Sequence, residues 1–204
     1  EDFLNGLLNG YVIINEKMDG AFFGKQKTAY DQFKYFKKSG EITYVDQVLM
    51  KYYNAAINHF QNLSMEKRQR VPANFFFGFE YFTRSDSNSS KRGALPKNGL
   101  VLSYIHRLDD GGKIVETLQS KEQLTRWANY LEVEAPAIIF EGRLDDEQKS
   151  KILEFAYSEQ KDLEDKFKTT SFTKHIISVL CPDEKEQFSD RELDTIVFRF
   201  YGDD

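Results

Sequence analysis

Apolar residues recur in two different patterns along the 204-residue chain, and the patterns predict a mixture of strands and helices. Short apolar or alternating runs between turn residues are typical of β-strands. Such runs predict strands at residues 11–14, 21–24, 32–36, 74–82, 99–106, 113–117, 137–140 and 193–201. Apolar residues three and four positions apart are typical of helices that pack on a core. This spacing predicts helices at residues 44–63, 120–131, 145–168 and 172–180.

Two of the expected helices begin with a capping box. Ser120 with Gln123, and Asp145 with Gln148, have the spacing at which a side chain and a backbone N–H satisfy each other at a helix start. The helices of the second half are acidic and carry no recognisable catalytic spacing. We therefore expect residues 144–182 to form a helical insertion or cover on a sheet domain.

Two polar segments predict connections without regular structure. Residues 64–70 are expected to be a basic connector that ends at Pro72. Residues 83–98 are rich in serine, asparagine, glycine, lysine and arginine, which is typical of a surface loop.

Composition narrows the class of protein. With 18 Phe and 11 Tyr the chain favours aromatic-rich sheets over a plain helical bundle. No apolar run approaches the roughly 20 residues of a membrane span, and no signal peptide is visible. The single cysteine, Cys181, excludes an internal disulfide and fits a reducing cytoplasm, where we expect it to be a buried apolar residue. The three histidines lack metal-ligand spacing, so we expect no zinc site.

Charge is distributed unevenly. The net charge of −5 argues against the broad basic face of a dedicated nucleic-acid binder. Residues 17–70, however, hold ten Lys or Arg against five acids, so this segment is +5 and the remainder is −10. A phosphate-bearing ligand would be attracted to the basic segment. The alternative is that these lysines are solvated on exposed faces.

The stretch YVIINEKMDG, residues 11–20, carries the strongest candidate for chemistry. An apolar run of strand type ends at a charged group that contains Lys17. At a strand end the ammonium can project into a cleft, where partial desolvation would lower its pKa toward nucleophilic competence. Gly20 allows a tight turn, and Asp19 can position a metal, a hydroxyl or the lysine. The alternative is a hairpin edge whose charges face water.

Glu-Lys-x-Asp-Gly after a strand resembles motif I of the nucleotidyltransferases that include ATP-dependent RNA and DNA ligases and mRNA capping enzymes. In that family the lysine attacks the α-phosphorus of a nucleotide and carries the nucleoside monophosphate as a phosphoramidate. The resemblance implies that Lys17 is the nucleophile and that Glu16, Asp19 and Gly20 contact the nucleotide. It also implies ATP as substrate, with Mg²⁺ or Mn²⁺.

Glu80 lies in the aromatic run NFFFGFEYF, residues 74–82. A carboxylate among so many aromatic side chains costs free energy unless it is hydrogen-bonded or paired. The run resembles motif III of the family, whose glutamate holds the nucleotide sugar or a metal, and this implies that role for Glu80. The alternative is a glutamate that faces outward from the strand.

Two further residues lie where the family contacts its nucleotide or polynucleotide. Lys38 precedes a Ser-Gly turn, at the place where the family has a basic residue that contacts the ribose or the polynucleotide. Tyr104 lies where the family's motif IIIa has an aromatic residue that stacks on the purine. The alternatives are an ordinary cationic turn for Lys38 and a plain core aromatic for Tyr104.

Residues 193–201, LDTIVFRFY, resemble motif IV of the family. The resemblance implies that Asp194 binds the metal and that Arg199 contacts the phosphates. Aspartate replaces the family's glutamate, threonine its glycine and arginine its lysine, so a metal at Asp194 would lie nearer the strand. Alternation places Arg199 on the strand face opposite Phe198 and Phe200. The Lys-x-Lys strand of motif V would follow beyond residue 204, so we expect the chain to be part of a longer one.

The resemblance runs along nearly the whole chain. It implies an α+β fold in which antiparallel β-sheets form a nucleotide cleft with helices outside, in a single domain over residues 1–204. The expected function is that of a monomeric, cytoplasmic, ATP-dependent polynucleotide ligase. It would form lysyl-AMP and act on 5′-phosphorylated RNA or DNA, with RNA favoured, away from membranes.

Two other functions stay open on the sequence alone. One is a non-catalytic nucleotide-binding or assembly module that kept the fold while motif IV decayed. The other is an unrelated α+β interaction protein in which the match at Lys17 is chance.

Overall fold

The computed structural model describes residues 2–16, 20–29, 31–83, 95–157, 170–182 and 196–201. The fold belongs to the α+β class and its named strands pair antiparallel, as expected from the sequence. The chain divides into two compact units. Unit 2 is the continuous segment Met18–Pro136, inserted between the two segments of unit 1, Glu1–Lys17 and Ala137–Asp204.

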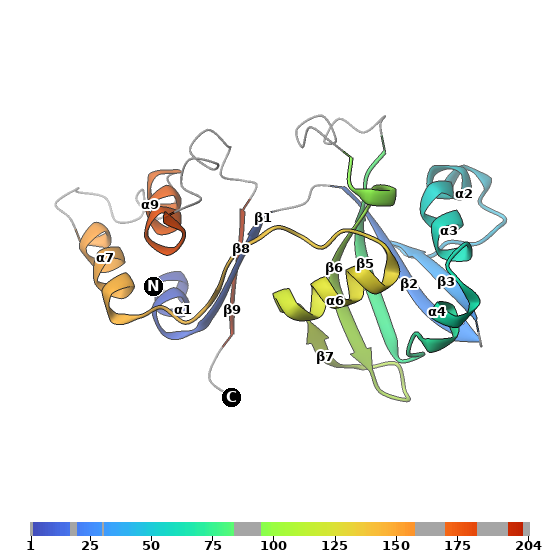
Figure 1. Cartoon of the computed structure of the whole chain (residues 1–204), viewed down its shortest axis with the longest axis horizontal. Helices are drawn as coiled ribbons and strands as arrows, with labels where there is room; N and C mark the ends of the chain where they lie inside the picture. Colours follow the sequence, from blue (N-terminus) through green and yellow to red (C-terminus); the bar gives the residue numbers. More distant parts are fainter. Residues whose placement is uncertain are drawn as a thin grey trace. The chain divides into compact units, whose positions relative to one another are not determined.

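Unit 2 is built on a six-stranded sheet with the spatial order β4, β3, β2, β5, β6, β7 (Figure 1). Its strands are β2 (Ala21–Ala29), β3 (Gln32–Lys37), β4 (Gly40–Glu41), β5 (Phe75–Tyr81), β6 (Leu100–Leu108) and β7 (Ile114–Leu118). A short 3₁₀ turn, η1 (Lys97–Gly99), precedes β6.

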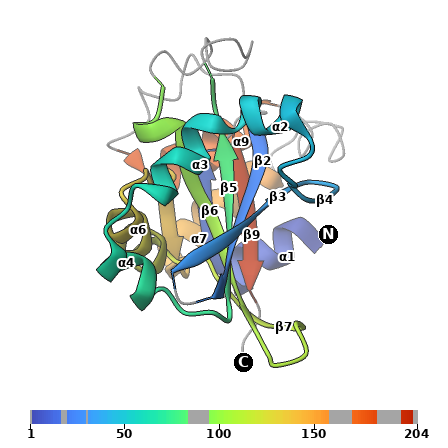
Figure 2. The same cartoon turned by 90° about the vertical axis from the view of Figure 1, so that its right-hand side faces the viewer.

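Helices cover one face of this sheet (Figure 2). They are α2 (Gln47–Tyr52), α3 (Asn54–Gln61), α4 (Met65–Arg70) and α6 (Lys121–Leu131). We call the opposite face the open face, because no helix among the described residues of unit 2 lies on it.

The core of unit 2 is aromatic because alternation along the strands directs every second side chain to the helices. Phe23 of β2 and Phe77 of β5 are fully buried. Their ring centroids lie 6.1 Å from Phe60 of α3 and 5.6 Å from Trp127 of α6, respectively. Burial of each such side chain contributes about 1.5–3 kcal/mol, so β2 and β5 are held firmly beneath the helices.

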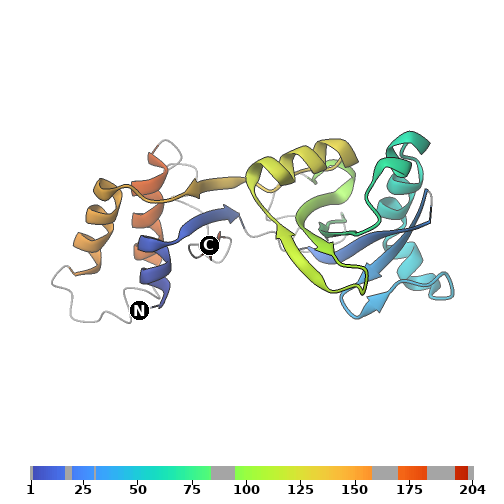
Figure 3. The same cartoon turned by 90° about the horizontal axis from the view of Figure 1, so that it is seen from below.

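Unit 1 contains a second sheet with the order β8, β1, β9, made of β8 (Ile138–Gly142), β1 (Tyr11–Glu16) and β9 (Ile196–Tyr201). Helices α1 (Asp2–Asn9), α7 (Asp146–Ala156) and α9 (Thr170–Leu180) lie on one face of it (Figures 1 and 3). Val12 and Ile14 of β1 are buried with Ile152 of α7 and Ile176 of α9. The helices expected within residues 144–182 therefore cover this sheet, and the single domain over residues 1–204 stays a prediction.

The long helix expected at residues 44–63 is wrong. Two helices, α2 and α3, occupy the region, and Tyr53 between them has the backbone angles φ −90° and ψ 10°. The side chain of Asp46 caps α2, so the helix begins only at Gln47. As a result Val45 and Val48 are exposed, with fractional exposures of 76% and 79%, although the spacing predicts that they are buried.

Two other helices lie where the sequence predicts none. Ser64 accepts a hydrogen bond from the backbone N–H of Lys67 and so caps α4, in the segment expected to be a connector. Helix α1 precedes residue 11, where the prediction begins, although Phe3, Leu4 and Leu7 have helical spacing.

Other local predictions are confirmed. Both capping boxes, Ser120 with Gln123 and Asp145 with Gln148, are present with their reciprocal hydrogen bonds. Cys181 is buried, as expected. Helix α7 ends at Ala156, and the end of the helix expected at residue 168 lies outside the described residues. In the part of the chain that the structure describes, no helix is long and apolar enough to cross a membrane.

Candidate functional site

Three of the predicted site residues, Lys17, Asp19 and Asp194, lie outside the described residues. The strand before Lys17 is present, because β1 ends at Glu16. Glu16 pairs with Ile196, the first residue of β9. The chain therefore passes from a paired strand end directly to Lys17, as the sequence predicts.

Gly20, at the other end of the candidate stretch, is tied to Glu80. The backbone N–H of Gly20 donates to Oε2 of Glu80 at 3.2 Å. The register between β2 and β5 brings the two together, since it pairs Phe22 with Glu80. A Cβ on Gly20 would lie 2.7 Å from the carbonyl oxygen of Tyr81, so no other residue fits here without a shift. The residue three positions after Lys17 thus lies beside the carboxylate expected from motif III.

Tyr104 lies on the open face of the sheet and next to the same carboxylate. It pairs with Gly78 across β5 and β6. Partial burial raises the pKa of the Tyr104 phenol, and the nearby charge of Glu80 raises it further. The alternative of a plain core aromatic is excluded, because the buried core of unit 2 lies on the helix-covered face and does not include Tyr104.

The ring of Tyr104 lies flat over Gly78. Three of its carbon atoms, Cζ, Cε1 and Cε2, lie 2.3, 2.5 and 2.6 Å from the point where a Cβ of Gly78 would be. A Cβ stands roughly perpendicular to a sheet, so nearly equal distances to these atoms mean that the ring is parallel to the sheet. One ring face rests on the backbone and the other points away from it.

Lys38 lies at the end of the sheet where Glu80 and Gly20 lie. It follows β3 in the exposed turn that leads to β4. Phe36 of β3 pairs with Gly24 of β2, so the end of β3 is beside the start of β2. Unit 2 therefore brings Gly20, Lys38 and Glu80 to one end of its sheet, and Glu80 shares the open face with Tyr104, which lies at the middle of β6.

Arg199 belongs to unit 1. It lies on β9 opposite Ile13 of β1 and is half-buried. Phe198 and Phe200 pack on the core of that unit, so Arg199 projects from the other face of the strand and the predicted alternation is confirmed.

The metal site expected at Glu80 and Asp194 stays a prediction, because Asp194 lies outside the described residues. Among the residues that are described, no group of three His, Cys, Asp or Glu side chains is close enough to hold a metal ion.

Lys25 is a chemically unusual residue that the sequence reasoning missed. It is fully buried in the core of unit 2, and its Nζ has no hydrogen-bond partner among the described residues. Nζ lies 4.2 Å from the ring centroids of Phe33 and Phe60 and 5.1 Å from that of Phe77. Burial lowers the pKa of Lys25 well below its ordinary value of 10.5. The sequence signal for its burial was its position two residues after Phe23. The signal was missed because the strand was expected to end at residue 24.

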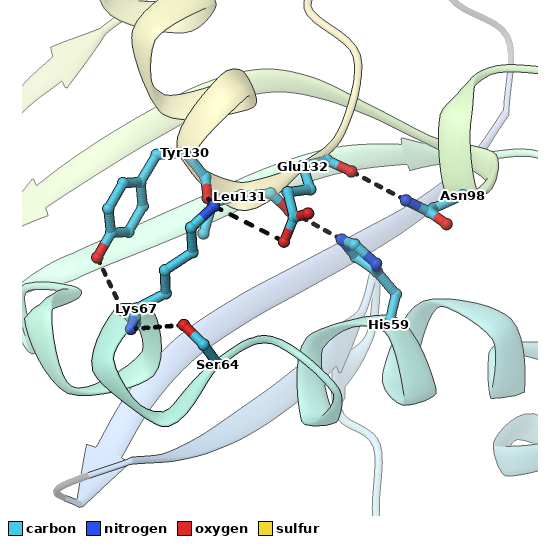
Figure 4. A network of polar contacts seen from close by, with 7 residues as sticks. All are labelled: His59, Ser64, Lys67, Asn98, Tyr130, Leu131 and Glu132. Atoms are coloured by element: carbon cyan, nitrogen blue, oxygen red, sulfur yellow. Dashed lines mark hydrogen bonds and ion pairs between the residues drawn. The ribbon is translucent and has the colours of Figure 1, made fainter.

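A polar network at the end of α6 is structural (Figure 4). Three side chains reach the last carbonyl oxygens of that helix: His59 Nε2 lies 2.8 Å from Leu131 O, Lys67 Nζ donates to Tyr130 O at 3.0 Å, and Asn98 Nδ2 donates to Glu132 O at 2.9 Å. These are carbonyl groups that a helix end leaves without a partner. His59 is therefore engaged in capping a helix, away from the open face.

The sequence matches no family model and no curated protein sequence.

Proposed function

We propose that the protein is an ATP-dependent nucleotidyltransferase of the ligase type, which forms lysyl-AMP at Lys17 and passes the nucleotide to a 5′-phosphate of a polynucleotide, with RNA favoured over DNA. The observation that carries the proposal is the hydrogen bond between Gly20 and Glu80. It joins the end of the stretch that contains Lys17 to the carboxylate that the resemblance assigns to nucleotide binding.

The residues of unit 2 fit a nucleoside. The ring of Tyr104 lies flat over Gly78, with its centroid 4.4 Å from that of His106, and stacking of a base on such aromatic side chains is favourable by about 1–3 kcal/mol. The carboxylate of Glu80, two residue pairs away along β5 and β6, is a hydrogen-bond acceptor suited to ribose hydroxyls. Lys38, in the exposed turn at the same sheet end, supplies positive charge for phosphate.

In the proposed reaction the neutral amine of Lys17 forms a bond to the α-phosphorus of ATP. The bond from phosphorus to the bridging oxygen of pyrophosphate breaks, and the amine loses a proton to solvent. Positioning and electrostatic stabilisation dominate such transfers, so the cationic side chains matter as much as the nucleophile. Mg²⁺ or Mn²⁺ bound by carboxylates would offset the charge on the leaving pyrophosphate.

Intact-protein mass spectrometry after incubation with ATP and Mg²⁺ tests the proposal. We expect an AMP adduct on the wild-type chain and none on Lys17→Ala. Lys51→Ala is the matched control, because Lys51 is an exposed lysine on α2. An adduct of unchanged amount in Lys17→Ala would remove Lys17 from the mechanism.

The same incubation with α-labelled ATP separates the alternatives. Saturable binding without an adduct would identify a nucleotide-binding module, which the replacements in residues 193–201 favour as the second candidate. Neither binding nor an adduct would leave an interaction protein in which the match at Lys17 is chance.

A further inference from the structure

The aromatic side chains on the open face of unit 2 extend beyond Tyr104, whose ring centroid lies 4.4 Å from that of His106. The pairing of β3, β2, β5, β6 and β7 places five residues side by side across this face: Lys34, Gln26, Phe76, His106 and Thr117. The neighbouring row contains Phe36, Gly24, Gly78 and Tyr104. With strands spaced about 4.8 Å apart, the row that contains Phe76 extends across about 19 Å of sheet.

Three rings, those of Phe36, Phe76 and His106, form a continuous aromatic surface. The ring centroids of Phe36 and Phe76 lie 5.3 Å apart in an edge-to-face arrangement, with their planes at 61°, and those of Phe76 and His106 lie 6.4 Å apart with their planes at 22°. Thr117 Oγ1 lies 2.9 Å from Nδ1 of His106 and fixes that ring. All three rings are half-buried, in contrast to the fully buried Phe77 on the other face of β5.

Gly24 makes room for this surface. A Cβ at Gly24 would lie 2.5 Å from Cζ of Phe76 and 3.1 Å from Cβ of Phe36. The ring of Phe76 therefore leans across β2 and lies over the backbone of Gly24. Together with the flat ring of Tyr104 over Gly78, this arrangement spreads aromatic rings along the sheet instead of directing them into a core.

The exposed charges beside these rings lie at the edge of the sheet, whereas the half-buried Glu80 lies on the central strand β5 and acts on Tyr104. Lys34 is exposed at the end of the row that contains Phe76, and within the described part of the chain its ammonium makes no hydrogen bond or ion pair. One acid, Glu41 of β4, is also exposed beside Phe36. Burial lowers the pKa of His106 below its ordinary value of 6.5, so its ring is neutral at neutral pH.

We propose that Phe36, Phe76 and His106 form a stacking surface for the unpaired bases of a single-stranded nucleic acid, with Lys34 contacting a phosphate at its edge. Aromatic side chains beside a cation are a combination that binds single strands, because every base has a π face and every nucleotide carries a phosphate. The stacking surface depends on the function proposed above in one respect: the bound strand would be the acceptor of the nucleotide.

The composition of the surface favours a single strand over a duplex. In a duplex the base faces are stacked on one another and are not available to protein rings, so binding would depend on phosphate contacts. The open face offers few cations for such contacts, and the net charge of the chain is −5. A single strand can instead gain most of its binding free energy from the rings.

The test is fluorescence anisotropy with a labelled oligothymidylate that lacks a 5′-phosphate, in the absence of ATP. We expect the wild-type chain to bind it and Phe76→Leu to bind it at least about fivefold more weakly, since leucine keeps the apolar volume but removes the π face. Phe75→Leu is the matched control. Phe75 is the preceding residue, and its ring contacts Trp127 on the helix-covered face, so its loss should leave affinity unchanged.

Lys34→Gln keeps the proposal falsifiable if Phe76→Leu fails to fold, because Lys34 is exposed. The loss of the Lys34 charge should reduce the slope of log affinity against log salt concentration by about 0.7. Lys51→Gln, on the opposite side of unit 2, should leave that slope unchanged. Unchanged affinity in Phe76→Leu and an unchanged slope in Lys34→Gln would overturn the proposal.

Other outcomes separate this proposal from the proposed function. An AMP adduct without oligonucleotide binding would overturn the stacking surface alone. Oligonucleotide binding that depends on Phe76, without an adduct, would uphold the surface and contradict the nucleotidyltransferase. A wild-type dimer in light scattering that Phe76→Leu dissociates would show that a second copy occupies the surface, and would overturn the proposal.

Discussion

The backbone N–H of Gly20 and the carboxylate of Glu80 lie 3.2 Å apart as donor and acceptor, although 60 residues separate them in the chain. The pairing of β2 with β5 creates this contact, because Ala21 and Phe22 lie opposite Tyr81 and Glu80. The contact fixes the backbone of Gly20 at the start of β2. Glu80 also influences Tyr104, so one carboxylate connects three of the segments expected to bind a nucleotide.

The first prediction concerns this carboxylate. Glu80→Gln keeps an acceptor for the Gly20 N–H but removes the charge beside Tyr104. The pKa of Tyr104 should therefore fall, yet stay above the ordinary value of 10.0, because burial is the larger cause of its rise. Titration of ¹³C-labelled tyrosine by NMR measures it.

Glu116→Gln is the control for this titration. Glu116 forms an ion pair with Arg107 at 2.9 Å on β6 and β7, so its removal changes the charge of the same sheet without touching Glu80. A Tyr104 pKa that is unchanged in Glu80→Gln would contradict the electrostatic effect of Glu80 on the Tyr104 phenol.

The second prediction concerns Gly78. An added Cβ in Gly78→Ala would lie 2.3 Å from Cζ of Tyr104, so the ring has to leave its flat position. We expect an overpacking cost of about 1–3 kcal/mol in the free energy of unfolding. If Tyr104 stacks on the nucleobase, the ATP dissociation constant should also rise about fivefold or more.

Gly111→Ala is the comparison for Gly78→Ala. Its Cβ would meet only Oδ1 of Asp109, at 3.4 Å, in an exposed turn. Calorimetric titration with ATP should give the wild-type dissociation constant for Gly111→Ala. Equal ATP affinity in the two variants would exclude Tyr104 from the nucleotide site.

The third prediction concerns Lys25. Because its pKa in the folded state is lowered, the folded chain binds fewer protons than the unfolded chain at pH values below 10.5. The contribution of Lys25 to the free energy of unfolding is therefore fully present above pH 10.5. It is lost as the pH falls toward the pKa that Lys25 has in the folded chain. The free energy of unfolding should decrease by about 1.4 kcal/mol per pH unit within this window.

Lys25→Met tests the cause of that pH dependence. Methionine has a similar length and no charge, so the variant should be more stable than wild type at neutral pH and should lose the slope. Urea unfolding at several pH values measures both quantities, with Lys51→Met as an exposed control. A large destabilisation of Lys25→Met would instead mean that a charged Lys25 is stabilised by the three phenylalanine rings.

Local signals explain which parts of the fold the sequence predicts. The capping boxes at Ser120 and Asp145 depend on residues three positions apart, and the strands depend on alternation, so both are visible without tertiary structure. Val48 shows the limit of such signals. It has the spacing of a buried residue but is exposed, because the cap at Asp46 and the break at Tyr53 set where the helices begin and end.

The candidate site depends on strand pairing that the sequence does not reveal directly. Periodicity cannot show that Gly20 contacts Glu80 or that Tyr104 covers Gly78, because each contact joins different strands. Only the order of the motifs suggested that Glu80 and Tyr104 act together. Lys25 was missed for a related reason, since the pairing of β2 with β3 and β5 extends that strand into a segment that looks polar.

The fourth prediction concerns Arg199, which projects from the face of β9 opposite Phe198 and Phe200. Arginine offers a planar fork for two phosphate oxygens, where lysine offers a point charge. If Arg199 contacts the triphosphate, its loss should cost about 1.5–3 kcal/mol of binding free energy. Calorimetry should then show that the ATP dissociation constant of Arg199→Ala is raised about tenfold or more.

The pattern of the loss identifies its origin. A phosphate contact is indifferent to the base, so ATP and GTP should be affected by similar factors in Arg199→Ala, whereas Gly78→Ala disturbs the surface expected to hold the base. Arg126→Ala is the control, because Arg126 is an exposed arginine on α6. Unchanged ATP affinity in Arg199→Ala would make Arg199 a structural residue of the three-stranded sheet. The resemblance of residues 193–201 to motif IV would then no longer support the enzyme, because Arg199 is the described residue on which that resemblance depends.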